Sequence, residues 1–137
     1  MTSEFTIAVH ALVFLNHKGT FQSSEELAEN ICTNPARIRK VMSKLKKAGM
    51  IETKEGVVGG YHFAGTAEET TLYMVAEAME FAFVSTGWKS GGGHKECLIA
   101  SGMADVMEEL YSDLNKSCLT HLKGITIADI DQKIFRG

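Results

Sequence analysis

The chain has 137 residues, 45% of them hydrophobic, and a formal net charge of −3 from 14 Lys+Arg and 17 Asp+Glu, which suits a single globular domain. Its longest apolar run, residues 7–15, contains His10 and is far shorter than the roughly 20 residues that cross a bilayer. Its three cysteines are widely spaced and form no CxxC pair. We therefore expect no membrane segment, no export and no disulfide framework, and a reducing cytoplasm as the location.

Two short helices are predicted near the start of the chain. Apolar residues at helical spacing indicate a largely buried helix over residues 4–17, which Gly19 ends. Ser23 and Glu26 then have the spacing of a capping box, so a second helix should run over about residues 24–30.

A third helix is predicted from Pro35 to about Ala48, because Asn34 can cap it, proline suits its first position and Gly49 can end it. Its two faces differ. One face should pack inward and consists of Ile38, Val41, Met42 and Leu45. The opposite face carries small or cationic side chains at Ala36, Lys40, Ser43 and Lys47, and it is flanked by Arg37 and Lys44 on one side and by Arg39 and Lys46 on the other. Cys32, in the turn before this helix, is expected to be buried.

Positive charge is concentrated around this helix. Residues 34–54 hold seven of the 14 Lys+Arg and one of the 17 Asp+Glu, so this window carries +6 and the remainder −9. A charge run can be merely a solvated helix face. However, residues 37–47 contain six cations and no acid, and a purely structural helix would gain more from alternating signs. An anionic partner such as nucleic acid is the simplest compensation.

A β-hairpin is predicted directly after the basic helix. Residues 50–54 alternate in sidedness, residues 56–60 form a glycine-rich turn, and residues 61–63 return as a second strand. Two short helices joined by a tight turn, followed by a hairpin, predict a winged helix-turn-helix, and the fold class is mainly α with a small β-hairpin. A second interpretation keeps this fold as a protein-interaction module with little DNA affinity, because Glu55 and the net charge oppose DNA.

The middle of the chain is predicted to connect two parts. Thr70 or Thr71 should cap a bridging helix that extends to about Phe83, and residues 85–93 contain four glycines and should form a loop. This loop lacks a phosphate-binding glycine motif. Phe81, Trp88 and Tyr111 could line a small effector pocket, although ordinary core positions are the more common role of such aromatic residues.

A long helix is predicted over residues 96–123. Its apolar stripe exceeds what a domain of this size can cover and calls for a second copy of the chain, which predicts a homodimer. The stripe consists of Ile99, Met103, Val106, Leu110, Leu114, Cys118 and Leu122. Thr126 should cap a last short helix whose Ile127, Ile130 and Ile134 face inward.

The cysteines and histidines do not form a convincing metal site. His94, Cys97, Cys118 and His121 have zinc-like spacings, but residues 97 and 118 lie about 30 Å apart on one helix, so a single chain cannot close the site. A metal site or disulfide between two subunits, in an antiparallel dimer that crosses near Met107, is the alternative. Cys118 is expected to be a packed core thiol. Cys97 lies at a helix start beside His94 and Lys95, which favours a reactive thiolate and a redox role, with an inert thiol as the alternative.

No catalytic constellation is recognisable, so no enzymatic activity is expected.

The chain resembles the Rrf2 family of bacterial transcriptional regulators. The resemblance rests on Leu45-Lys46-Lys47-Ala48-Gly49-Met50-Ile51 and on Gly56-Val57-Val58-Gly59-Gly60-Tyr61, and it extends over nearly the whole chain. It implies a homodimeric regulator, which we expect to be a repressor, on a palindromic operator in double-stranded DNA. It also implies DNA contacts from the third helix, at Ala36, Arg37, Lys40, Ser43, Lys44 and Lys47, and from the wing, at Val57, Val58, Gly59, Gly60 and Tyr61.

The chain also departs from the family pattern. Glu55 stands where the family has an arginine before the wing glycine, which weakens the expected wing contact. Iron–sulfur members carry three closely spaced cysteines between the wing and the long helix, whereas this chain has only Cys97 there, which argues against a cluster. No cofactor is therefore expected. The expected organisation is a DNA-binding domain over residues 1–66, a bridging helix and loop over 67–95, and dimerisation and C-terminal helices over 96–137.

Overall fold

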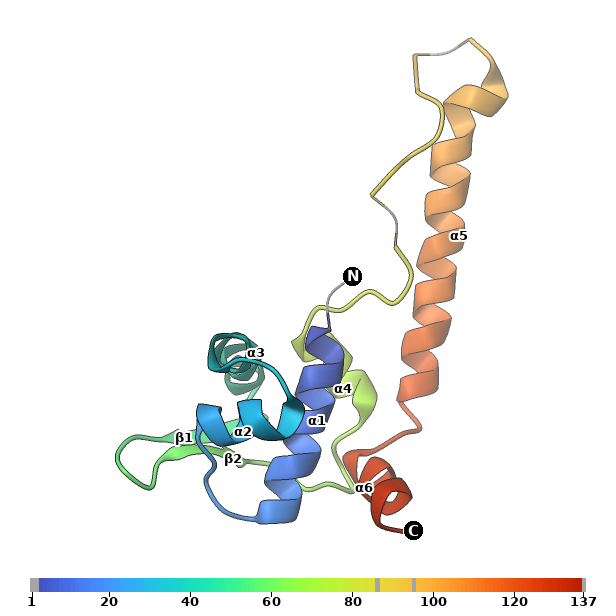
Figure 1. Ribbon diagram of the computed structural model, residues 1–137. Helices are drawn as coiled ribbons and strands as arrows, with labels where there is room; N and C mark the ends of the chain where they lie inside the picture. The colour runs from blue at the N-terminus through green and yellow to red at the C-terminus, as the bar shows by residue number, and fades with distance from the viewer. Residues whose placement is uncertain (1–2, 86, 95, 137) are drawn as a thin grey trace. The chain divides into compact units, whose positions relative to one another are not determined.

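The computed structural model describes residues 3–85, 87–94 and 96–136 (Figure 1). The chain is mostly helical and forms two compact units, one of residues 1–81 with 122–137 and one of residues 82–121. The helices are α1 (Glu4–Lys18), α2 (Ser24–Ile31), α3 (Pro35–Lys47), α4 (Leu72–Ala78), α5 (Leu98–Leu122) and α6 (Ile127–Phe135). The strands are β1 (Ile51–Lys54) and β2 (Gly60–Phe63), and they pair antiparallel. The predicted fold class is confirmed.

Local capping sets the limits of the first three helices. Gly19 takes a left-handed conformation with φ 68° and donates its N–H to the carbonyl of Leu15, which ends α1. Ser23 and Glu26 form the predicted capping box at α2. Asn34 accepts a hydrogen bond from the backbone N–H of Arg37 at 2.9 Å, and Pro35 begins α3. The predicted starts of all three helices are confirmed, and those of α2 and α3 follow from caps formed by residues that are close in sequence.

The larger unit has a continuous apolar core around α1. Fully buried side chains from five helices meet there, and burying each one contributes about 1.5–3 kcal/mol. They include Leu12, Leu15, Leu27, Ile38, Met42, Leu45, Val75 and Ile127.

The wing is anchored to the loop between α1 and α2. The register of β1 and β2 runs from Ile51 opposite Phe63 to Lys54 opposite Gly60. Beyond this pair, Gln22 and Tyr61 exchange two backbone hydrogen bonds of 2.9 and 2.8 Å. The predicted hairpin is therefore confirmed, and it gains a bridge from the loop before α2 that holds β2 near its turn end.

α4 is shorter than predicted. It ends at Ala78 instead of about Phe83. Glu80 has φ 52°, and the N–H of Phe81 returns to the carbonyl of Ala76, a left-handed turn that closes the helix. The apolar residues after Ala78 continue the helical spacing and so predicted a longer helix, but this backbone turn ends α4 before them.

α6 packs with α4 and the winged-helix core. The N–H of Leu72 donates to Ile125 and the N–H of Ile127 donates to Thr70, so the segments before the two helices pair at a bridge between Thr71 and Thr126. These contacts attach the C-terminal helix to the unit that contains residues 1–81. Ile127 is buried as expected, whereas Ile134 is 59% exposed, so its predicted inward position is wrong.

α5 leaves its apolar stripe uncovered within this chain. The helix lies within two residues of the predicted limits, and none of its 25 residues is buried. Ile99, Val106, Leu110 and Leu114 are 45–70% exposed. None of the described helices combines the length and the apolarity needed to span a bilayer.

Candidate nucleic-acid interface

The inner face of α3 holds the helix rigidly against the core. Ile38, Val41, Met42 and Leu45 are each at most 1% exposed, as their spacing predicted. The opposite side projects into solvent and consists of Ala36, Arg37, Arg39, Lys40, Ser43, Lys46 and Lys47. A buried apolar face and a cationic outer face therefore coexist on thirteen residues.

The turn before α3 depends on Cys32. This residue takes a left-handed conformation with φ 64° and ends α2 by donating its N–H to the carbonyl of Ala28. The conformation leaves the cysteine exposed, so its predicted burial is wrong. Cysteine was expected inside because it is usually an apolar core residue, but its position in the chain reversal decides its exposure.

Two residues at the start of α1 contact the basic surface, and one of them, Glu4, neutralises part of its charge. Glu4 forms ion pairs with Lys44 at 2.5 Å and with Lys40 at 3.2 Å, and Ser3 accepts a hydrogen bond from the guanidinium of Arg37. The Lys44 hydrogen bond lowers the pKa of the Glu4 carboxyl, with a smaller contribution from Lys40. We define Glu4, Lys40 and Lys44 as the Glu4 cluster.

The Glu4 cluster makes the two predicted contact residues Lys40 and Lys44 differ in exposure. Lys44 keeps 38% of its side-chain area exposed, whereas Lys40 keeps 68%. Lys40 therefore remains available to an anionic partner, and Lys44 is held closer to the protein. Glu4 is 40 positions from Lys44, and no local sequence pattern could have indicated this contact.

The wing carries its most exposed residues at the tip. Val57 and Val58 are 105% and 75% exposed, within the turn that the N–H of Gly59 closes on the carbonyl of Gly56. Two apolar side chains in solvent on a short loop are unusual for a structural role alone. Glu55, beside this turn, is also exposed.

Three predicted contact residues of the wing also have a structural role in its backbone. They are Gly59, Gly60 and Tyr61. A Cβ on Gly59 would lie 2.2 Å from the carbonyl oxygen of Lys54, and one on Gly60 would lie 2.2 Å from that of Gln22. Tyr61 is half-buried, and this desolvation raises its pKa. Their fixed backbone is what holds the valine tip in place.

Cys97 is exposed at the start of α5. The backbone N–H groups of Ala100 and Ile99 lower the pKa of its thiol, because they stabilise the thiolate at the helix N-terminus. His94 is exposed nearby in sequence, and Lys95 lies outside the described residues. Cys118 is half-buried.

The cysteines do not fit an iron–sulfur cluster, which needs several thiolates around one centre. Cys32 belongs to the larger unit, while Cys97 and Cys118 stand 21 positions apart on and beside α5, about 30 Å along the helix axis. Among the residues that the structure describes, no three His, Cys, Asp or Glu side chains are grouped as metal ligands.

The fold and this surface define a winged helix-turn-helix DNA-binding regulator. The chain belongs to the Rrf2 family, described as an iron-dependent transcriptional regulator, whose sequence model matches residues 1–133. The family consists of regulators and not of enzymes.

Relatives and solved structures agree with this family. YwnA of Bacillus subtilis, which its name assigns to the HTH-type transcriptional regulators, is 22% identical over 98% of this chain and 99% of its own. A crystal structure from Lactobacillus plantarum, described as a transcriptional regulator, has a TM-score of 0.86 at 23% identity, covering 98% of this chain and 91% of its own. CymR, the global cysteine regulator of B. subtilis, has a TM-score of 0.69 at 15% identity, covering 97% and 96%.

Proposed function

We propose that this protein is a cytoplasmic, homodimeric transcriptional repressor that reads a palindromic operator. In this proposal α3 enters the major groove, where Ala36, Ser43 and Lys47 meet the DNA together with Arg37, Lys40 and Lys44. The wing, residues 57–61, lies along the backbone or the minor groove. The single observation that carries the proposal is the outward cationic face of α3, held in place by four buried side chains.

The size of α3 and its exposed side chains suits this role. A B-DNA major groove admits one helix, and lysine and arginine side chains supply phosphate contacts together with base-edge contacts. The Glu4 cluster positions two of these cations and removes part of the repulsion among them. The expectation that DNA alone balances this charge is therefore too simple, because Glu4 already supplies one anion.

Dimerisation is supported by α5. Its exposed apolar stripe is longer than a monomeric helix keeps in water, and a second copy of the same helix would cover it. Two α3 helices related by a two-fold axis would then meet two half-sites, which is why the operator is expected to be palindromic.

The proposal includes no iron–sulfur cluster and no other cofactor. A response to thiol oxidants is assigned to Cys97, whose lowered pKa and exposure favour reaction with them, and a small effector is the alternative signal. Repression, dimerisation and the thiol response are separate claims, and each has its own test.

The DNA interface is tested with Arg37→Ala/Lys40→Ala. Binding to a duplex from upstream of the gene is measured by fluorescence anisotropy over a salt series. We expect weaker binding at every salt concentration and a shallower salt dependence, by about one unit of slope per lost phosphate contact. The control Lys116→Ala/Lys133→Ala removes two exposed cations from α5 and α6 and should leave both quantities unchanged. Equal affinity of wild type and the α3 variant would show that this helix is not the DNA-contacting element.

A further inference from the structure

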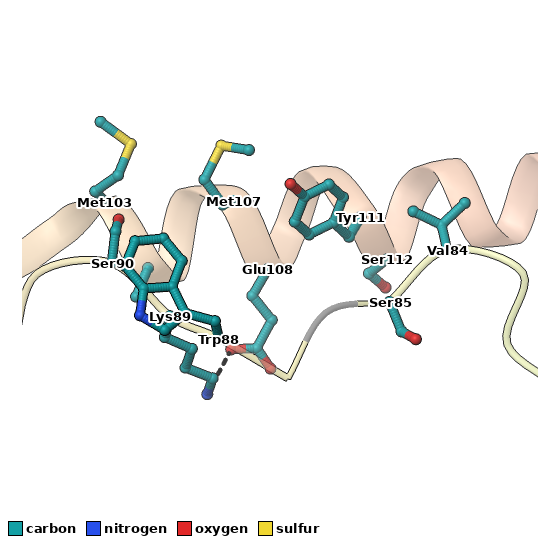
Figure 2. A pocket seen from close by; sticks show the side chains of 11 residues that line it. Val84, Ser85, Trp88, Lys89, Ser90, Met103, Met107, Glu108, Tyr111 and Ser112 are labelled. Atoms are coloured by element: carbon teal, nitrogen blue, oxygen red, sulfur yellow. Dashed lines mark hydrogen bonds and ion pairs between the residues drawn. The ribbon is translucent and has the colours of Figure 1, made fainter. Parts of the chain in front are cut away.

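The unit of residues 82–121 contains an open cavity of about 500 Å³ between its loop and one face of α5. Figure 2 shows Trp88 on the loop and Met103, Met107 and Tyr111 on successive turns of the helix. Cavities of this size commonly hold small molecules. Of the three aromatic residues considered from the sequence, Trp88 and Tyr111 line the cavity. Phe81 does not, because it belongs to the other unit and stacks on Phe5 at 5.5 Å between ring centroids.

The lining favours a flat apolar ligand. Trp88 and Tyr111 offer planar rings, and the thioethers of Met103 and Met107 are polarizable groups that adapt to an aromatic surface. Trp88 is 75% exposed, so a ring placed against it would remove a large apolar area from water.

The charges of the lining favour an uncharged ligand. Lys89 and Glu108 are paired at 3.4 Å, as the dashed line in Figure 2 marks, so the two charges cancel. A charged ligand would have to break the ion pair of Lys89 and Glu108 or lie close to the member of the pair that has the same charge as the ligand. The other polar groups of the lining are uncharged: the hydroxyls of Ser85, Ser90 and Ser112, the phenol of Tyr111 and the indole N–H of Trp88. They can form hydrogen bonds with a hydroxyl or carbonyl group.

The cavity adjoins the stripe proposed for dimerisation, and around the helix axis Met107 lies about 20° from Leu114 of that stripe. Successive helical residues are about 100° apart around the axis, so Tyr111 lies about 100° from Leu110 of the stripe. Met103 borders both surfaces and is 38% exposed. A ligand can therefore occupy the cavity while the centre of the stripe stays available.

We propose that a small, uncharged, planar aromatic molecule with a hydroxyl or carbonyl group binds between Trp88 and the face of α5 around Met107 and Tyr111. This molecule is the effector of the regulator, a role that rests on the proposed function. Because the ligand contacts both the glycine-rich loop and α5, it couples their conformations, and binding free energy becomes available to change DNA affinity.

The binding test uses 2-naphthol as the probe and the full-length protein without DNA. Isothermal titration calorimetry gives the affinity, and the fluorescence of Trp88, which is the single tryptophan of the chain, reports the place of binding. We expect saturable binding with quenching of Trp88. Naphthalene-2-carboxylate, with the same rings and a negative charge, should bind about tenfold more weakly. Absence of 2-naphthol binding, or tighter binding of the carboxylate, would overturn the proposal.

Two variants locate the site. Ala104→Leu fills the cavity from α5, and Trp88→Ala removes the loop ring while leaving the helix sequence intact. Each should weaken 2-naphthol binding about tenfold or more. The control Glu109→Leu adds a leucine on the same helix at an exposed position that does not line the cavity, and it should bind like wild type. Circular dichroism checks folding, and wild-type affinity in a folded Ala104→Leu or Trp88→Ala variant would place the ligand elsewhere.

Operator affinity with and without 2-naphthol separates this inference from the proposed function. Occupancy is expected to change operator affinity about tenfold, within the usual range of coupling between sites. DNA binding without 2-naphthol binding would refute the effector site alone. Binding of 2-naphthol by a protein that has no affinity for DNA would refute the proposed function alone. Ligand binding that leaves operator affinity unchanged would refute the effector role.

Discussion

Individual ion pairs decide how much of the positive charge on α3 can reach DNA. Glu4 is only 13% exposed and contacts Lys40 and Lys44, so one carboxylate offsets two of the predicted contact residues. The value of such partly exposed pairs is about 1 kcal/mol or less, which is too small to prevent DNA binding but large enough to adjust it.

Replacing Glu4 should therefore strengthen DNA binding. In Glu4→Gln, Lys40 and Lys44 lose their internal anion, and a negative charge near the phosphates disappears. We expect operator affinity to rise by up to about fivefold at low salt, with a smaller gain at high salt because screening weakens both interactions.

Anisotropy titrations measure this change, with Glu29→Gln on α2 as the charge-matched control at an exposed position. The same affinity in Glu4→Gln and Glu29→Gln would show that the Glu4 cluster has no role in binding.

Cys97 should be the most reactive thiol of the chain. Because backbone N–H groups lower the pKa of Cys97, a larger fraction of its thiol is thiolate at neutral pH. Its faster labelling relative to the other cysteines should vanish at a pH where every thiol is ionised. Iodoacetamide labelling followed by peptide mass spectrometry compares Cys97 with Cys32, which is also exposed.

The effect of Cys97 oxidation on DNA binding is tested by treating wild type and Cys97→Ser with diamide. Operator affinity should change only in wild type. A response of the same size in both proteins would assign the oxidation to another cysteine.

At the scale of elements, the backbone geometry of the wing fixes the position of its exposed tip. The bridge between Gln22 and Tyr61 joins the turn end of β2 to the loop before α2, and Gly60 lies where this bridge leaves no room for a side chain. The glycines that the family resemblance assigns to DNA contact thus have a structural reason to be glycine.

Gly60→Ala should destabilise the protein by about 2 kcal/mol or more. Its Cβ would lie 2.2 Å from the carbonyl of Gln22 at a φ of 131°, so the bridge must open or the strand must shift. Urea denaturation measures the loss. The control Gly87→Ala has no neighbour within 4 Å of the added Cβ and should change the free energy of unfolding by less than about 0.5 kcal/mol. Similar values for the two variants would contradict this account of the wing.

For the whole molecule, the exposed stripe of α5 is the main feature that a single chain leaves unexplained. Val106 and Leu110 are 62% and 46% exposed at the middle of the helix. Water contact along several turns of apolar side chains is unfavourable, and association of two copies is the simplest way to remove it.

Val106→Glu/Leu110→Glu should convert the dimer to a monomer, because charges at the centre of an apolar interface lose hydration without gaining partners. Analytical ultracentrifugation gives the oligomeric state, and operator binding should weaken in parallel. Lys116→Glu changes the net charge by the same two units on a different side of α5 and should remain dimeric. A monomeric wild type would remove this part of the proposal.

The sequence by itself determined the order of elements, most of their limits and the basic outer face of α3. These features depend on residues within a few positions of one another: the capping box of Ser23 and Glu26, the Asn34 cap with Pro35, and the apolar spacing from Ile38 to Leu45. Only the tertiary structure decided the Glu4 cluster, the bridge from Gln22 to Tyr61, the exposure of Cys32 and Ile134, and the cavity beside Trp88. The exposure of Cys32 follows from the backbone turn that ends α2. The other features depend on packing between residues that are distant in the sequence, and a local sequence pattern does not indicate which distant residues will be in contact.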